Sequence, residues 1–354
     1  MMHGGFNNLL PRAVLTVYAF QGNYGVNYGM IADNLPSPGS VVTLLKAAKI
    51  KNTRIYTADH EVLKAFNGSG IEIIVGLGNQ FLTEMSDNVQ PFLPGTRIVG
   101  IAVGNEILGG DDHELWEVLL PTVKNVYSAL EKLGLTKTVQ VLSPHSEAVF
   151  ENSYPPSSCV FKEDILVYMK PLLQFFSQAG SPFYINAYPF LAYKVDPVTI
   201  DINYALFKSN KGIHDPKTNL HYDNMFEAQG GPSKGDDNEP GASVENARAY
   251  NHNLRKRLAK KKGTPYRPKL PMRAYIFALF NENLKPGPTS ERNFGLFKPD
   301  GSIAYDIGFT GLKDSSGPPS PVPFQVLGAY GWVGSSCTLL LTACITLLLL
   351  VSDS

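Results

Sequence analysis

The stretch that decides the fold is Arg97-Ile-Val-Gly-Ile-Ala-Val-Gly-Asn-Glu-Ile-Leu-Gly109. Its apolar run, Ile98–Val103, is followed by Gly104 and then by the polar pair Asn105 and Glu106. An apolar run that ends at a glycine indicates a fully buried strand of a parallel sheet. A carboxylate at the carboxyl end of such a strand occupies the place where βα-barrel enzymes carry their catalytic residues. A strand-end Glu that pairs with an Arg, or that caps the next helix, would give the same sequence.

Length and composition limit the possible classes of protein. The chain has 354 residues, enough for one large α/β barrel or for two smaller domains. Its hydrophobic content of 44% is ordinary for a globular protein with a sizeable core. The formal net charge is zero, so the overall charge favours neither nucleic acid nor an acidic membrane surface as a partner. We therefore expect no nucleic-acid partner, and we interpret the basic run Arg255–Lys262 as the solvated end of a surface helix.

Short apolar runs recur along the chain, and helical patterns lie between them, which predicts βα units and a parallel sheet. We place strands at Gly25–Gly29, Thr53–Thr57, Ile71–Leu77, Ile98–Val103, Thr138–Ser143, Phe183–Ala187 and Arg273–Phe280. Helices are expected around Val41–Leu45, Leu119–Leu130 and Ile165–Phe176, and over Ser243–Lys261 with Ser243 as the N-cap. No Gly-rich phosphate motif follows the first strand, which argues against a dinucleotide-binding fold.

One interval breaks the regular spacing of the strands. Early strands start roughly 20 to 45 residues apart, near the 30 or so residues per unit of an eight-unit barrel. The interval between Ala187 and Arg273 contains no convincing strand. We expect it to hold a polar loop, a helix start, and a Gly/Asp-rich loop, at Ser209–Tyr222, Asn224–Gln229 and Gly230–Gly241 respectively. The prediction is therefore an α/β TIM-type (β/α)8 barrel with seven of its eight strands, although an open edge leaves backbone groups unpaired.

The two ends of the chain carry targeting signals of unequal strength. Residues 1–23 are a weak signal-peptide candidate, because a polar run precedes the short apolar segment. At the carboxyl end, the small residues Ser315–Gly317, a proline-rich spacer and the apolar stretch Val326–Val351 follow one another in the order of a GPI lipid-anchor signal. A membrane span is the alternative, which the glycines and the lack of a flanking Lys or Arg disfavour. We thus divide the chain into 1–23, a barrel over 24–312, a Ser/Pro-rich linker over 313–325 and an anchor signal over 326–354.

Cysteines and a sequon bear on the compartment. Cys159 is the one thiol of the predicted body, because Cys337 and Cys344 lie in the apolar tail, so no disulfide can form within the body. Asn67-Gly68-Ser69 is a glycosylation sequon, which matters only if the chain enters the secretory route.

Several motifs, in their order along the chain, resemble those of plant endo-β-1,3-glucanases of glycoside hydrolase family 17. They are Gly25-Val-Asn-Tyr-Gly29, Ile31-Ala-Asp-Asn-Leu-Pro36, Arg54-Ile-Tyr56, Ala102-Val-Gly-Asn-Glu106, Asn186-Ala-Tyr-Pro189 and Phe277-Ala-Leu-Phe-Asn-Glu282. The likeness runs from about Tyr24 to Gly311. It implies an eightfold βα barrel, retaining hydrolysis of a callose-type β-1,3-glucan, and no metal or organic cofactor. It also implies a secreted protein at the outer face of the plasma membrane, GPI-anchored, or in the cell wall, with a role in plant defence. We expect a monomer.

The resemblance assigns roles to individual residues. Retaining hydrolysis requires two carboxyl groups about 5 to 5.5 Å apart, one acting as acid and the other as nucleophile. The acid of the family corresponds to Glu106, which would protonate the glycosidic oxygen, and Asn105 would hydrogen-bond the sugar 2-hydroxyl. Turn formation is the alternative role of Asn105.

Two further groups of residues match the family's site. A polar cluster that holds the catalytic carboxyls in place electrostatically corresponds to Glu282, Lys285 and Glu291, although an exposed ion-pair network would have the same sequence. Aromatic residues that line the glucan groove correspond to Tyr56, Tyr188 and Phe280, although isolated aromatic residues are more often part of a core.

The family's nucleophile lies in a Glu-Thr-Gly-Trp-Pro-Ser motif at the end of the seventh strand. Its counterpart here is Gly230-Gly-Pro-Ser-Lys-Gly-Asp236, which places the Glu position at Ala228 and the Trp position at Gly231. We expect the chain to lack the seventh strand, the body of the preceding helix and the nucleophile, a segment of roughly 25 residues. Neither Glu227, on a truncated helix, nor Glu239, in a flexible loop, is expected to replace the nucleophile.

Three functions therefore stay open on sequence alone. The first is an active endo-β-1,3-glucanase. The second is a catalytically impaired glucan-binding protein, since the acid is present without its partner. The third is a truncated isoform that folds poorly.

Overall fold

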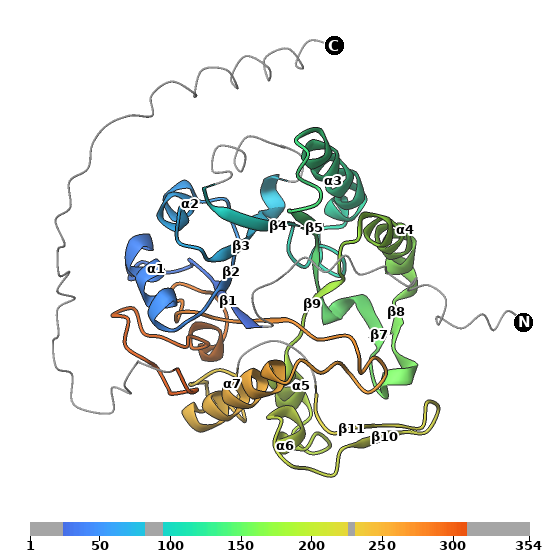
Figure 1. Cartoon of the computed structure of the whole chain (residues 1–354). Helices are drawn as coiled ribbons and strands as arrows, with labels where there is room; N and C mark the ends of the chain where they lie inside the picture. Colours follow the sequence, from blue (N-terminus) through green and yellow to red (C-terminus); the bar gives the residue numbers. More distant parts are fainter. Residues whose placement is uncertain (1–23, 82–94, 226–230, 310–354) are drawn as a thin grey trace, which may run out of the picture. The chain divides into compact units, whose positions relative to one another are not determined.

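The computed structural model describes residues 24–81, 95–225 and 231–309, which form an α/β body with helices around a curved parallel sheet (Figure 1). The spatial order of the main sheet is β12 (Ala274–Ile276), β1 (Tyr24–Tyr28), β2 (Asn52–Ile55), β3 (Glu72–Leu77), β4 (Arg97–Val103) and β5 (Gln140–Leu142). After Ser143, β6 (Pro144–Ser146) pairs in parallel with β9 (Tyr184–Asn186) and thereby extends this order. The predicted segments 1–23, 313–325 and 326–354 lie outside the described residues, as do Glu227 and Ala228.

All seven predicted strands are present, so the prediction of a parallel βα sheet is confirmed. β1 lies between β12 and β2, with Val26 opposite Ile276 on one side and Thr53 on the other. The Ile and Val residues of β3 are buried on both faces of the sheet. Burial on both faces is typical of a parallel sheet with helices on its outer face and a packed interior on its inner face. β3 and β4 end where predicted, and the other five predicted strands end earlier, where the polar motifs begin.

Residues on the two faces of the sheet belong to different apolar clusters. Alternate residues of five strands meet inside the curved sheet: Ile74, Ala102, Leu142, Tyr184 and Tyr275. The intervening residues, such as Ile73, Val103 and Val141, face the larger cluster that the surrounding helices complete. Because β9 and β12 both contribute to the inner cluster, the sheet curves round far enough to bring its two ends to one interior.

Helices cover the outside of the sheet. They are α1 (Pro38–Ala47), α2 (His60–Phe66), α3 (His113–Lys132), α4 (Glu163–Ala179), α5 (Pro189–Val195), α6 (Ile202–Ala205) and α7 (Val244–Ala259), with 3-10 turns at η2 (Asn79–Phe81), η4 (Glu147–Val149), η5 (Pro156–Ser158) and η6 (Thr289–Arg292). The four predicted helices correspond to α1, α3, α4 and α7. The predicted N-cap is confirmed, because the Ser243 side chain accepts from the Asn246 N–H.

The barrel is not closed by the strands that the structure describes. β9 pairs with β6 and β12 pairs with β1, and no ladder joins β9 to β12 within residues 24–81, 95–225 and 231–309. The chain between these two strands instead contributes α5, α6 and α7 (Figure 1). The structure is therefore that of a βα barrel without its seventh strand, as the spacing predicted.

Two expectations for this interval were wrong. Ser209–Tyr222 is not a plain loop, because β10 (Ile213–Asp215) and β11 (Leu220–Tyr222) form an antiparallel hairpin outside the main sheet. Earlier in the chain, a second antiparallel pair that was not predicted joins β7 (Phe150–Asn152) to β8 (Val160–Phe161). Within the same interval as the hairpin, the predicted helix start also differs. Asn224 and Met225 are not helical, and the rest of the predicted helix start lies outside the described residues. In the described part of the chain, no helix is long and apolar enough to cross a membrane.

His145 on β6 makes the stability of the fold depend on pH. Its ring is fully buried and stacks on Phe183, and neither ring nitrogen has a hydrogen-bond partner among the described residues. Burial lowers the pKa of His145 from 6.5 to about 4. The folded-state pKa lies below the unfolded one, so stability is full above pH 6.5 and is lost as the pH falls towards 4.

We expect His145→Phe to remove this dependence. The free energy of unfolding of the native chain should fall by roughly 2–3 kcal/mol between pH 7 and pH 4.5, and the variant should lose clearly less. Urea unfolding at the two pH values measures both quantities. Equal losses in the two proteins would show that His145 is not the group that titrates.

Candidate active site

A tight turn at the end of β4 orients Glu106. Gly104 and Glu106 both have left-handed backbone angles, with φ of 65° and 57°, which is unusual for a glutamate. The turn is held by the Asn79 side chain, which accepts from the Asn105 N–H at 2.8 Å and donates to the Asn105 carbonyl at 3.2 Å. The Glu106 N–H donates to the Pro144 carbonyl at 2.9 Å. These bonds fix the backbone of the predicted acid between two neighbouring strands.

A network of amides around a buried arginine surrounds this turn. Arg54, which is 4% exposed, donates to Asn105 Oδ1 at 2.7 Å and to Asn186 Oδ1 at 3.3 Å. Asn186 Nδ2 donates to Asn105 Oδ1 at 3.1 Å and to Glu106 Oε1 at 2.7 Å. The amide oxygen of Asn105 is thus occupied, and its NH2 group is available to donate to a ligand. Arg54 and Asn186 belong to the motifs of the family resemblance but were not predicted as site residues.

Tyr188 completes the surroundings of Glu106. Its hydroxyl donates to Glu106 Oε1 at 2.5 Å. Burial, and then the neighbouring Glu106 charge and this bond, raise the pKa of Tyr188 well above its usual value, so the hydroxyl stays a donor. Glu106 Oε1 accepts from Tyr188 and from Asn186, whereas Oε2 has no partner among the described residues. The second oxygen can therefore face a substrate.

Glu282 lies in the segment that follows β12, and its carboxyl contacts the residues that follow β1. It is 3% exposed and accepts from the Ile31 N–H at 2.9 Å. Burial raises the pKa of the Glu282 carboxyl, and the Lys285 charge opposes that rise. A methyl group on Gly29 would lie 2.4 Å from the carboxyl atoms of Glu282, so only glycine leaves room for the carboxyl in this position.

Lys285 interacts with both acids of the predicted polar cluster. Its Nζ donates to Glu291 Oε2 at 2.7 Å, and both side chains are about one-quarter exposed. The same ammonium lies 4.3 Å from the centre of the Phe277 ring, within the range of a cation–π contact. The cluster of Glu282, Lys285 and Glu291 is thus partly enclosed, unlike a freely exposed ion-pair network.

Charge effects on two tyrosines show that Glu106 and the cluster of Glu282, Lys285 and Glu291 are neighbours. Burial is the largest cause that raises the pKa of Tyr56 to about 12, and the charges of Glu282 and Glu106 both contribute. The Tyr188 hydroxyl likewise responds to Glu106, Tyr56 and Glu291. The structure therefore brings together Tyr56, Asn105, Glu106, Tyr188, Glu282, Lys285 and Glu291.

The prediction that Phe280 lines the groove was wrong. Phe280 is 1% exposed and packs edge-on against Tyr28 in the main core, on the helix side of the sheet. The aromatic residue of this strand that belongs to the site is Phe277, which contacts Tyr56 edge-to-face with ring centres 6.4 Å apart. Alternation along β12 could have found it, because Tyr275 faces the barrel interior and Phe277 follows two residues later.

Glu239 is ordered and not part of a flexible loop, contrary to expectation. Its side chain is fully buried, and four hydrogen bonds reach its two oxygens, from Lys194 Nζ, Ser290 Oγ, the Ser290 N–H and the Asp236 N–H. Burial would raise the pKa of this carboxyl, but the hydrogen bonds outweigh it and lower the pKa to about 2. A carboxylate with every acceptor position occupied is a structural group, which agrees with the expectation that Glu239 is not the nucleophile.

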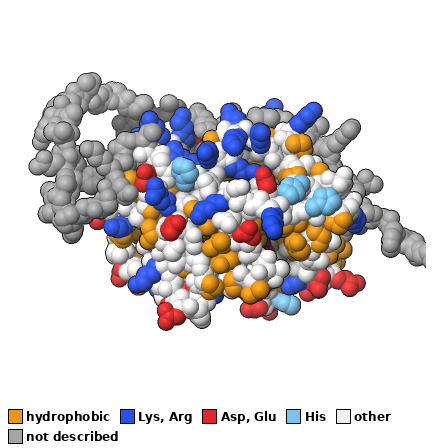
Figure 2. Space-filling view, turned by 90° about the horizontal axis from the view of Figure 1, so that it is seen from below, with side chains coloured by type: hydrophobic (Ala, Val, Ile, Leu, Met, Phe, Trp, Pro, Cys, Tyr) orange, Lys and Arg blue, Asp and Glu red, His pale blue; other side chains and the backbone are white. Residues whose placement is uncertain are grey.

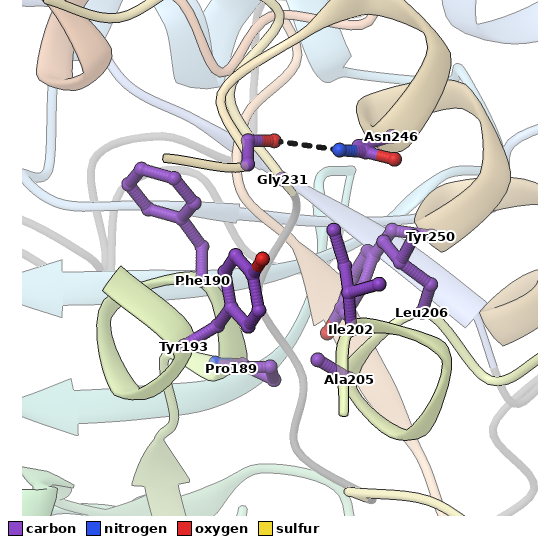
Figure 3. Close-up of a pocket in the computed structure, with 10 residues that line it drawn as sticks. Pro189, Phe190, Tyr193, Ile202, Ala205, Leu206, Gly231, Asn246 and Tyr250 are labelled. Atoms are coloured by element: carbon purple, nitrogen blue, oxygen red, sulfur yellow. Dashed lines mark hydrogen bonds between the residues drawn. The ribbon is translucent and has the colours of Figure 1, made fainter. Parts of the chain in front are cut away.

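A small apolar cavity of about 20 Å³ lies among α5, α6 and α7 (Figure 3). Phe190, Tyr193 and Tyr250 line it, and Asn246 closes one side by donating to the Gly241 carbonyl at 3.1 Å. This volume holds about one water molecule and cannot take a sugar ring. Among the described residues, no three His, Cys, Asp or Glu side chains gather as metal ligands. Asn67 of the sequon is exposed after α2, and its glycosylation stays a prediction.

The close approach of Gly29 to Glu282 gives a test of the site's geometry. Gly29→Ala should displace the Glu282 carboxyl and reduce sugar release from a β-1,3-glucan by about tenfold or more, since a 1 Å error of placement can cost that much. Gly39→Ala on α1 is the matched control, because its methyl group would meet nothing within 4 Å. Equal activity of the two variants would remove Glu282 from the working site.

Comparison with known proteins identifies the family of this chain. The sequence matches the family described as "Glycosyl hydrolases family 17" over residues 24–229 and 227–309. The chain belongs to glycosyl hydrolase family 17. A relative from Arabidopsis thaliana, named glucan endo-1,3-beta-glucosidase 14, is 48% identical over 321 residues, which cover 81% of this chain and 82% of the relative. A glucan endo-1,3-beta-D-glucosidase from Olea europaea is 40% identical, and the alignment covers 84% of this chain and 72% of that relative.

Solved structures of related glucanases have the same fold. One is CJP38, described as a beta-1,3-glucanase and allergen of Cryptomeria japonica pollen, with a TM-score of 0.77 and 38% identity over 81% of this chain and 99% of that chain. Another is one of two plant beta-glucan endohydrolases with distinct substrate specificities, with a TM-score of 0.73 and 33% identity over 80% of this chain and all of that chain.

Two features of the comparisons concern the continuity of this family 17 chain. The two matches to the family overlap only at residues 227–229. The alignment with the Arabidopsis relative has 321 positions but covers 81% of 354 residues, or about 287, so about 34 positions lack a residue of this chain. That length is close to one βα unit of a barrel of about 250 residues.

Proposed function

We propose that this chain hydrolyses internal β-1,3-glucosidic bonds of a callose-type β-1,3-glucan with retention, and that Glu106 is the proton donor. The observation that carries the proposal is the state of the Glu106 carboxyl, with Oε1 held by Tyr188 and Asn186 and with Oε2 open. The names of the family 17 relatives supply the substrate class.

Each residue of the site has a role in the proposed reaction. Tyr56 and Tyr188 contact the glucan chain, and the Asn105 amide donates to the sugar 2-hydroxyl beside the reacting carbon. Glu106 protonates the glycosidic oxygen as the C–O bond breaks, and retention requires a carboxylate on the opposite face that bonds to the anomeric carbon in the same step. Glu106 then takes a proton from the water that hydrolyses this glycosyl-enzyme. Glu282, Lys285 and Glu291 set the local charge around these steps, and Arg54 keeps both asparagines oriented.

The break in the chain favours a second candidate, a glucan-binding protein with impaired catalysis. The overlap at residues 227–229 and the unmatched positions of the relative support the loss of one βα unit, which carries the nucleophile in the family. Without an opposing carboxylate, a retaining mechanism cannot form its glycosyl-enzyme intermediate.

One experiment separates the two candidates. Purified full-length chain is incubated with laminarin, and released reducing sugar is measured, while retention is measured on insoluble β-1,3-glucan and on cellulose. Selective retention with sugar release supports the hydrolase, and selective retention without release supports the binding protein. Absence of retention on β-1,3-glucan contradicts both. The genomic sequence across Gln229 and Gly230 then tells whether a skipped exon encodes the nucleophile.

Location belongs to the same proposal. The chain is a secreted monomer, glycosylated at Asn67, that a GPI anchor holds at the outer face of the plasma membrane or that resides in the cell wall, where it serves plant defence. The order of small residues, proline-rich spacer and apolar stretch after Ser315 supports the anchor. Release from cells by a phosphatidylinositol-specific phospholipase is the expected result, and persistence on the membrane would favour a membrane span.

A further inference from the structure

The two ends of the barrel carry opposite charge although the chain as a whole is neutral. Parallel strands all start at one end, so the residues just before β2, β5 and β12 lie together there, beside the end of α7. Exposed basic residues gather at this end, which we name the basic end: Lys49, Lys51, Lys137, Lys260, Lys261, Lys262, Arg267 and Lys269. Of the acids there, Glu72 is buried and paired with Arg97, and Glu131 is exposed.

The opposite end, where the strands finish, holds the acidic side chains of the candidate active site. Glu106, Glu282 and Glu291 are among them, and Asp236 lies near the same loops through its bonds to Thr289. The basic side chains Arg54, Lys285 and Arg292 at this end are engaged by hydrogen bonds within it. Figure 2 shows a face of the molecule on which Lys and Arg side chains gather towards one edge, while several Asp and Glu side chains lie towards the opposite edge. The charge of the body is therefore polarised along the barrel.

The last described residues run along α7 towards the basic end. Arg248, in the second turn of the helix, donates to the Asp306 carbonyl, and Arg255, two turns further on, donates to the carbonyls of Ile307 and Gly308. The Arg255 guanidinium also lies 5.4 Å from the centre of the Phe309 ring. The chain thus leaves the described body in the direction in which α7 ends, at the basic run.

The apolar stretch follows soon after this exit. Residues 310–325 separate Phe309 from Val326, and even a fully extended chain of that length spans at most about 55 Å. The described chain ends at Phe309, which lies against Arg255 on the helix that leads into the basic end. Lysines and arginines near an anionic membrane are each attracted appreciably, and the attraction fades beyond a Debye length.

We propose that the basic end docks on the phosphate-bearing headgroups of an anionic lipid surface, so that the glucan site faces away from the membrane. The inference rests on the proposed membrane attachment of the tail for its orientation, but the charge contact can be measured without it. It also gives the run Arg255–Lys262 a role beyond the solvated helix end that its sequence suggested. A cluster of exposed lysines suits phosphate groups presented on a surface, because each ammonium is a point charge on a flexible stem and needs no fixed partner geometry.

The test uses the full-length chain and two kinds of vesicle, phosphatidylcholine alone and phosphatidylcholine mixed with phosphatidylinositol. Flotation at low and at physiological salt measures the bound fraction. Any apolar attachment by the tail is common to both vesicles, so the ratio of the two affinities isolates the charge contact. The test variant is Lys260→Gln/Lys261→Gln/Lys262→Gln. The control variant is Lys124→Gln/Lys170→Gln/Lys211→Gln, which removes the same charge from exposed lysines elsewhere.

We expect the native chain to prefer the anionic vesicles by at least about tenfold at low salt, and salt to reduce the preference. The test variant should lose most of this preference and the control variant should keep it. Equal binding to both vesicles, or equal losses in the two variants, would overturn the proposal. Retention on polygalacturonate without any preference for anionic vesicles would also overturn it and identify an acidic polysaccharide instead. Absence of binding to neutral vesicles bears on the tail alone.

Discussion

Replacing Glu106 by glutamine should lower the release of reducing sugar from laminarin by about 100-fold or more, the usual contribution of a general acid. The amide of glutamine keeps the volume of the side chain and can still accept from Tyr188 and Asn186 through its oxygen. The amide cannot donate a proton to the glycosidic oxygen as a general acid. Binding to insoluble β-1,3-glucan should therefore change little while turnover is lost.

The control for this result is Glu117→Gln, which neutralises an exposed carboxylate of α3 on the outside of the sheet. Its turnover should match that of the native chain. Equal release by the native chain and by the Glu106 variant would remove Glu106 from catalysis. Loss of glucan retention together with turnover would instead assign Glu106 to substrate binding or to the fold of the site.

Glu239→Ala should lower the free energy of unfolding by about 3 kcal/mol, the second large effect. The substitution leaves a largely enclosed Lys194 ammonium without its counter-ion and deprives Ser290 of both acceptors for its hydroxyl and N–H. In a domain of this size the melting temperature should fall by roughly 5 °C. Differential scanning calorimetry at pH 7 measures both quantities.

Asp237→Ala is the matched control, since Asp237 is an exposed acid of the same loop and a surface change costs within about 0.5 kcal/mol. Acid should reproduce the loss in the native chain. The folded-state pKa of Glu239, about 2, lies below the ordinary value of 4.5, so its contribution is full above pH 4.5 and disappears as the pH falls towards 2. Similar melting temperatures for the two variants would contradict the structural role of Glu239.

The parallel sheet could be predicted because its strands are short, continuous apolar runs that end at glycine or polar residues. The break was predictable for the same reason, since no such run occurs between Ala187 and Arg273. The alternation of side chains that begins in β12 continues to Phe277, which packs with the site residue Tyr56. The prediction instead placed Phe280 in the groove, although Phe280 packs in the main core. In a strand, a shift by an odd number of residues moves a side chain to the other face.

The polar connections could not be predicted in the same way. The hairpin of β10 and β11 has few apolar residues, and it is held by Asp215, which accepts from the Ser157 N–H and hydroxyl far away in the sequence. Glu239 was expected to be mobile because Gly, Asp and Pro surround it. Its order comes from Lys194 and Ser290, two residues of other elements, and local sequence carries no signal for such distant partners.

The most direct test of the central claim is the anomeric form of the first product. Laminarin is digested with the purified full-length chain, and proton NMR records the anomeric signals within the first minutes. A retaining endo-β-1,3-glucanase with Glu106 as the acid predicts that shorter glucans appear first as the β-anomer and then mutarotate. Products that appear first as the α-anomer, or glucan that is bound but not cleaved, would contradict it.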